Sequence, residues 1–126
     1  MKIDSSGRGV ALQLAFARLA IGSSAFFATG PALRALGFGG TDAAGGALAK
    51  MLGARDLAMG AFVLSARDDR AALRTATLAA AALDAGDAVA FLLALRDPRT
   101  RRAGLSGIVT AGVAAGAGLW TARRLG

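Results

Sequence analysis

Four long apolar stretches, separated by short polar segments, dominate the chain. They cover about residues 9–29, 43–66, 71–95 and 103–122. None shows the strict alternation of a half-buried strand, and each has roughly the 20 residues that a helix needs to cross a bilayer core. The pattern therefore predicts four membrane-spanning helices. The last stretch contains no charged residue and is the clearest of the four.

The segment between the first two stretches carries helix-stop and helix-start signals. Gly30-Pro31 is predicted to end the first helix, and residues 31–36 to form a short helical turn. Thr41 or Asp42 is the expected cap of the second helix.

The two later connections, at residues 67–70 and 96–102, are short and charged, and Asp68 or Asp69 is the expected cap of the third helix. Short connections place consecutive helices side by side and antiparallel. We therefore predict an all-α fold: a single-domain integral membrane four-helix bundle with up-down-up-down topology and both termini on one side.

Composition supports a membrane location. The chain is 55% hydrophobic and only 18% charged, whereas a soluble domain usually has about 25% charged residues. The net charge of +7 comes from basic residues that lie mostly between the apolar stretches. This placement favours anionic lipid headgroups over nucleic acid as the partner. Slightly more basic residues lie on the side of the termini, so the positive-inside rule favours cytoplasmic termini.

The absence of Cys and His removes whole classes of chemistry. Thiol catalysis, disulfides, imidazole catalysis and ordinary zinc sites all require these residues. No P-loop or dinucleotide fingerprint is present either, so no metal and no cofactor are expected. The reactive groups that remain are carboxylates, Arg, Lys, Ser and Thr.

Charged residues near the middle of three predicted helices form the main functional signal. They are Arg18 in the first, Arg55 and Asp56 in the second, and Asp84 and Asp87 in the third. A charge at bilayer depth costs about 2.5–3.5 kcal/mol on insertion scales, so partners at the same depth are expected. Antiparallel packing would bring these five residues to a similar depth.

Lys50 lies five residues before Arg55 and would bring this layer to three cations and three anions. Such neutrality suits a low-dielectric site. Two interpretations of the layer remain open. It lines a functional cavity, which we prefer, or it consists of ion pairs that fix helix register, Arg18 with Asp84 and Arg55 with Asp87.

The layer also suggests a chemistry. Asp84 and Asp87 are three residues apart and share a helix face, so one could activate a water as general base while the other, kept protonated, acts as general acid. Arg55 or Arg18 would bridge them or stabilise developing negative charge, and Asp56 would orient an arginine. Limonene-type epoxide hydrolases use similar chemistry on an unrelated fold.

The leading hypothesis is thus a membrane enzyme that hydrolyses or cyclises the epoxide of a lipophilic small molecule. Lys50, Met59, Phe62 and Phe91 are the expected substrate contacts. The alternative is a non-enzymatic membrane protein with structural ion pairs, either a small-solute or proton pathway or a helper subunit of a complex.

The segments Gly53-Ala54-Arg55-Asp56-Leu57-Ala58-Met59-Gly60 and Asp84-Ala85-Gly86-Asp87 resemble small four-helix bacterial membrane proteins of unknown function, loosely related to the DoxX-like group. The resemblance implies a four-helix membrane bundle and no established activity. The Ala, Gly and Arg bias also indicates a high-GC bacterial source, so the expected location is the bacterial inner membrane. Gly112-x-x-x-Gly116 permits close helix approach; packing within the chain is the main interpretation and a homodimer through the fourth helix the alternative.

Overall fold

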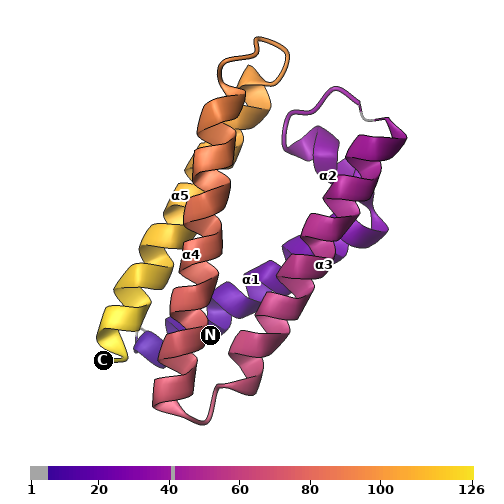
Figure 1. Cartoon of the computed structure of the whole chain (residues 1–126). Helices are drawn as coiled ribbons and strands as arrows, with labels where there is room; N and C mark the ends of the chain where they lie inside the picture. Colours follow the sequence, from indigo (N-terminus) through magenta and orange to yellow (C-terminus); the bar gives the residue numbers. More distant parts are fainter. Residues whose placement is uncertain (1–5, 41) are drawn as a thin grey trace.

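Helices are the only regular secondary structure in the residues that the computed structural model describes, 6–40 and 42–126 (Figure 1). This confirms the predicted all-α class, and the long helices lie within two residues of the predicted bounds. A fifth, short helix follows the first. The elements are α1 (Gly7–Phe27), α2 (Thr29–Ala35), α3 (Ala43–Ser65), α4 (Arg70–Ala94) and α5 (Arg101–Arg124).

Side-chain caps fix the starts of three long helices. Ser6 accepts a hydrogen bond from Gly9 N at 3.2 Å at the start of α1. Asp42 accepts one from Gly45 N at 2.8 Å, and Asp69 one from Ala72 N at 2.9 Å. Each satisfies a backbone N–H that has no partner within its helix. Asp42 and Asp69 are thus confirmed as caps, whereas Thr41 lies outside the described residues.

The break between α1 and α2 falls earlier than predicted. The first helix ends at Phe27, and Ala28 leaves the helical conformation with φ −122° and ψ 47°. Gly30-Pro31, the expected stop, instead lies in the first turn of α2. Proline is tolerated there because the first backbone N–H groups of a helix have no intrahelical acceptor. Gly30-Pro31 is therefore not the stop, and the first helix ends two residues before its predicted end at residue 29.

The end of α2 is tied to α5. Gly37 adopts a φ of +95°, which lets Phe38 N donate to Leu33 O at 3.0 Å and closes the helix. The Ser106 hydroxyl then donates to Leu36 O at 2.7 Å. The short helix is thereby attached to both halves of the chain.

The long helices pack as two tight antiparallel pairs, α1 with α3 and α4 with α5, and the pairs diverge toward the end that carries α2 (Figure 1). Glycine allows the backbones of α1 and α3 to touch: a Cβ at Gly22 would lie 2.8 Å from Gly53 O, and one at Gly53 would lie 2.8 Å from Gly22 O. A single evenly packed four-helix bundle stays a prediction.

The buried core lies at the opposite end, where α1 begins and α5 ends. It is built mainly from small residues, which explains the close packing of helices there. The larger members are Val63, Leu73 and Leu125, and Met59 packs against them from α3. The two helix pairs are therefore joined at this end and open at the other.

Three helices, α1, α4 and α5, are long and apolar enough to cross a membrane. The helix α3 has the length but carries Lys50, Arg55 and Asp56 near its centre. Large apolar side chains such as Phe27, Met51 and Val113 are 67–78% exposed. So many exposed apolar groups suit a lipid environment.

Gly112 and Gly116 face outward on α5, with nothing within 4 Å of a Cβ at either position. The interpretation that they pack within the chain is therefore wrong. The glycines of α5 that do contact another helix are Gly104, Gly107 and Gly118, all against α4. A homodimer through this face stays a prediction.

Candidate functional site

Two charged residues occupy the small-residue contact line between α1 and α3. Positions along this line alternate in steps of three and four residues, as expected where one helix face packs on another. Arg18 and Asp56 stand where the pattern otherwise places alanine, glycine or valine. The line consists of Ala11, Ala15, Arg18 and Gly22 on α1, and Ala49, Gly53, Asp56, Gly60 and Val63 on α3.

Arg18 connects three helices. Its Nη1 donates to Asp56 Oδ1 on α3 at 3.3 Å. Its Nη2 donates to Asp84 Oδ2 and to Ala80 O, both on α4, the latter at 3.1 Å. Only 10% of the Arg18 side chain and 11% of the Asp84 side chain are exposed. The guanidinium therefore joins the two helix pairs.

Arg55 makes the second set of contacts. Its two terminal nitrogens hold Asp87 in a forked arrangement, with Nη1–Oδ1 at 2.9 Å and Nη2–Oδ2 at 2.6 Å. Nη2 also donates to Asp56 Oδ1 at 3.1 Å. Such bidentate contacts are stronger and more directional than a single hydrogen bond. They link α3 to α4 beside the Arg18 contacts.

The five residues form one continuous ionic cluster in the order Asp84, Arg18, Asp56, Arg55, Asp87. Both predicted pairs, Arg18 with Asp84 and Arg55 with Asp87, are present, and Asp56 joins the two arginines. Neither arginine bridges Asp84 to Asp87 directly in these contacts. The cluster brings together all five residues predicted to be catalytic.

Lys50 does not join the ionic cluster. Its Nζ donates to Phe26 O at 2.8 Å and lies 5.5 Å from the centre of the Phe26 ring. The predicted balance of three cations and three anions therefore does not hold. Two arginines face three aspartates, which leaves one excess negative charge. A proton, or a cationic group on a ligand, would neutralise the cluster.

An apolar groove of about 620 Å³ lies between the diverging helix pairs and includes all five cluster residues in its lining. This volume falls within the usual range for small-molecule sites. The walls are almost wholly apolar, with Ile21 from α1, Leu48 and Leu52 from α3, and Phe91 and Ala114 from α4 and α5. Leu33 of α2 and Leu36, directly after it, also line the groove.

Of the four predicted substrate contacts, only Phe91 lines this apolar groove. Met59 packs into the core at the other end, and Phe62 lies on an exposed face of α3 with 49% exposure. Lys50 is exposed beside Phe26. Helical periodicity explains the misses at Met59 and Phe62, because residues six and nine positions from Gly53 turn to other faces.

The sequence-based reasoning missed most of the groove wall. Leu33, in the short second helix, and Leu36, directly after it, lie in the segment 31–36, which was predicted as a short helical turn but not as part of a site. Ala114 belongs to the last stretch, whose lack of charge gave no functional signal. The alternating small residues of α5 were the available signal, since they mark the face turned toward α4.

Two polar atoms on groove-lining residues are buried without a hydrogen-bond partner in the described part of the chain. They are Arg55 Nε and Thr77 Oγ1. An unsatisfied buried donor typically costs about 1–3 kcal/mol, so an added acceptor would be favourable at either atom. No group of three or more metal-ligating side chains suited to a metal ion occurs within residues 6–40 and 42–126.

Comparison with known proteins gives no relative from which a function could be transferred: no family model, curated protein or solved structure matches the chain. The structure alone therefore defines the class of protein. It is an all-helical protein with three helices able to cross a membrane, a buried ionic cluster and an adjoining apolar groove.

Proposed function

We propose that the protein is an integral membrane protein that binds a lipophilic small molecule in the apolar groove, with the polar group of that molecule at the ionic cluster. In this proposal α3 crosses the membrane with α1, α4 and α5, because its central charges are paired with neighbouring helices rather than exposed to lipid. Four crossings place both termini on one side, which the positive-inside rule favours as cytoplasmic.

The observation that carries the proposal is the position of the cluster in the groove wall. Ion pairs that served only to lock helices would be equally effective in a dry core. Here five charged residues adjoin about 620 Å³ of largely apolar space. An apolar site with a few converging polar groups is the usual form of a small-molecule site.

The reaction that suits these groups best is acid–base opening of an epoxide. One carboxylate would take a proton from water as the water attacks the epoxide carbon, and a protonated carboxyl would donate to the epoxide oxygen, yielding a diol. Asp84 and Asp87 would fill these roles, and Arg18 and Arg55 would hold them. The cluster has one aspartate more than it has arginines, which favours one protonated carboxyl, and an acid–base pair needs such a group.

The test is turnover of a lipophilic terpene epoxide by the purified protein in detergent, with the diol measured by chromatography. Asp84→Asn and Asp87→Asn should each abolish turnover while thermal unfolding remains cooperative. Full activity in both variants would refute the catalytic assignment.

A matched pair of variants tests the groove itself. Ala114→Phe would fill the groove from α5, whereas Val113→Phe adds an aromatic ring on the outer face of the same helix. Ala114→Phe should therefore prevent turnover, and Val113→Phe should leave it unchanged. Equal activity in the two variants would refute the apolar groove as the substrate-binding site.

A structural or proton-conducting role is the second candidate, and one observation favours it. All three aspartates of the cluster already contact an arginine. A purely structural ion pair should tolerate an exchange of its two charges. The double variant Arg55→Asp with Asp87→Arg would then regain both the stability and any activity that each single variant loses. Under the enzymatic proposal the exchange would restore stability without turnover.

A further inference from the structure

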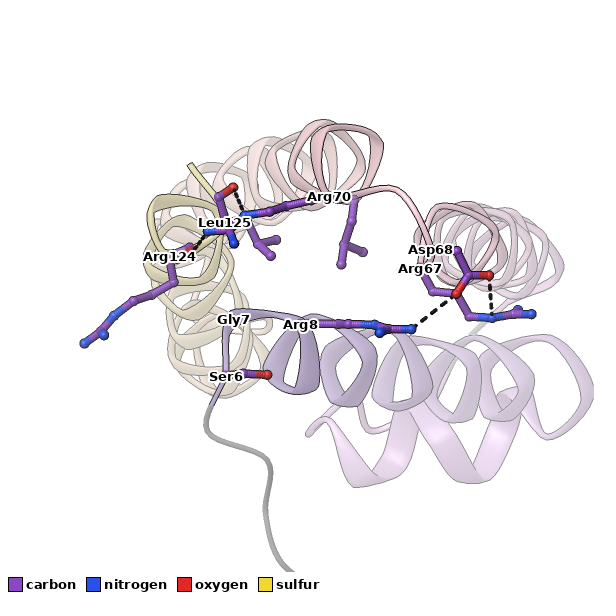
Figure 2. Close-up of a pocket in the computed structure, with 9 residues that line it drawn as sticks. Ser6, Gly7, Arg8, Arg67, Asp68, Arg70, Arg124 and Leu125 are labelled. Atoms are coloured by element: carbon purple, nitrogen blue, oxygen red, sulfur yellow. Dashed lines mark hydrogen bonds and ion pairs between the residues drawn. The ribbon is translucent and has the colours of Figure 1, made fainter.

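A second cavity lies at the end of the molecule where α1 and α4 begin and α5 ends, away from the apolar groove. It has a volume of about 440 Å³ (Figure 2). Four of its nine lining residues are arginines, and one is acidic. We call it the arginine pocket; its lining is Ser6, Gly7, Arg8, Arg67, Asp68, Arg70, Leu73, Arg124 and Leu125.

Two of the arginines have structural contacts. Arg70 Nε donates to Leu125 O at 2.8 Å, and its Nη2 donates to Arg124 O at 3.1 Å, which ties the start of α4 to the end of α5. The Arg124 guanidinium lies 5.0 Å from the ring centre of Trp120 and points away from the pocket (Figure 2). These two side chains build the wall and add positive charge around it.

Arg8 and Arg67 are differently placed, because they share one carboxylate. Arg8 Nη2 lies 3.2 Å from Asp68 Oδ1, and Arg67 Nε lies 3.4 Å from Asp68 Oδ2 (Figure 2). Both side chains are more than half exposed. A guanidinium has five N–H donors, so each keeps donors free for another anion. Together with Arg70, these groups leave the pocket with an excess of positive charge.

The pocket also has an interfacial position. Leu73 and Leu125 belong to its lining, but they are only 1% and 7% exposed and offer a ligand almost no apolar surface. Trp120, one turn before Arg124, is 43% exposed. Tryptophan beside arginine at the end of an apolar helix is typical of the headgroup region of a membrane. A ligand here would therefore meet arginines at the expected level of the lipid headgroups.

We infer that the arginine pocket binds the phosphate group of an anionic phospholipid. Arginine suits phosphate because its planar donors match the phosphate oxygens. The position of the pocket near the exposed Trp120, at the expected membrane interface, favours a lipid headgroup over free phosphate. A lipid held here would contact the start of α1, the α3–α4 turn and the end of α5, and would so stabilise the joined end of the two helix pairs.

The experiment compares thermal unfolding of the protein in micelles of neutral detergent with added phosphatidylglycerol, phosphatidylcholine or inorganic phosphate. Phosphatidylglycerol should raise the unfolding temperature, and the other two should not. An interfacial arginine contributes about a factor of five to the binding of anionic lipid. The double variant Arg8→Gln with Arg67→Gln should therefore need about 25 times more phosphatidylglycerol for the same rise in unfolding temperature.

The control removes the same charge from the other end of the protein. Arg99→Gln with Arg101→Gln should keep the full response to phosphatidylglycerol, because neither residue lines the pocket. An equal loss in the two double variants would show only a general charge effect and would overturn the proposal. Equal stabilisation by inorganic phosphate would show that free phosphate is sufficient and would refute the lipid as the ligand. If the pocket double variant does not fold, Arg67→Gln alone, which keeps the Arg8–Asp68 pair, should show about a fivefold weakening, and an unchanged response would refute the site.

Discussion

Gly53→Ala tests the close approach of α1 and α3 on which the ionic cluster depends. The added methyl group would lie 2.8 Å from Gly22 O, 2.9 Å from Phe26 N and 3.1 Å from Ala25 Cβ. Two of these neighbours are backbone atoms, which cannot turn aside as a flexible side chain can. The two helices would have to separate by roughly half an ångström to restore ordinary contact distances.

The expected cost follows from two opposing effects. Overpacking a close contact typically costs about 1–3 kcal/mol. Replacing glycine by alanine inside a helix returns up to about 1 kcal/mol through helix propensity. The separation would also stretch the Arg18–Asp56 contact, which at 3.3 Å is already long. We therefore expect a net loss of about 1–2 kcal/mol in the free energy of unfolding.

The assay is thermal unfolding in detergent, followed by circular dichroism, with Gly112→Ala as the matched control. That glycine has nothing within 4 Å of its Cβ position, so only the propensity gain applies. Gly53→Ala should unfold about 4–8 °C below the natural sequence, and Gly112→Ala at or above it. A Gly53→Ala variant as stable as Gly112→Ala would refute the backbone contact between α1 and α3.

Three further predictions concern single contacts. Arg55→Lys keeps the charge but loses the forked contact with Asp87, so unfolding by denaturant should show a loss of about 1–2 kcal/mol, and no loss would argue against that contact. Asp69→Ala removes the cap of α4 and should cost about 1 kcal/mol in the same assay, whereas Asp69→Ser should recover most of it; a Ser variant as unstable as Ala would exclude capping as the cause. Ser106→Ala removes the hydrogen bond to Leu36 O, so amide hydrogen exchange should become faster in α2 but not in α4. The control is Thr110→Ala, which loses only a hydrogen bond within α5, and unchanged exchange in α2 of the Ser106→Ala variant would contradict the attachment of α2 to α5.

The sequence alone determined the helical class, the bounds of the long helices and the identity of the ionic cluster. Apolar runs of about 20 residues without alternation specify helices through local geometry. The caps Asp42 and Asp69 were readable because they act within one turn. The cluster was readable because charges such as Arg18 and Asp84 are costly in an apolar run, and a costly charge predicts a partner at similar depth.

Only the tertiary structure decided how the helices pair, where the apolar groove lies and which charges meet. The pairing of α1 with α3 depends on backbone contact at Gly22 and Gly53, and a glycine-rich chain offers many such positions without marking which are used. Lys50 was predicted in the cluster from its depth alone, but its rotation about the helix axis directs it to Phe26. The depth of a residue along its helix follows from its position in the sequence, whereas the neighbour that its side chain faces depends on the angle between the packed helices. That angle arises from contacts between residues far apart in the chain.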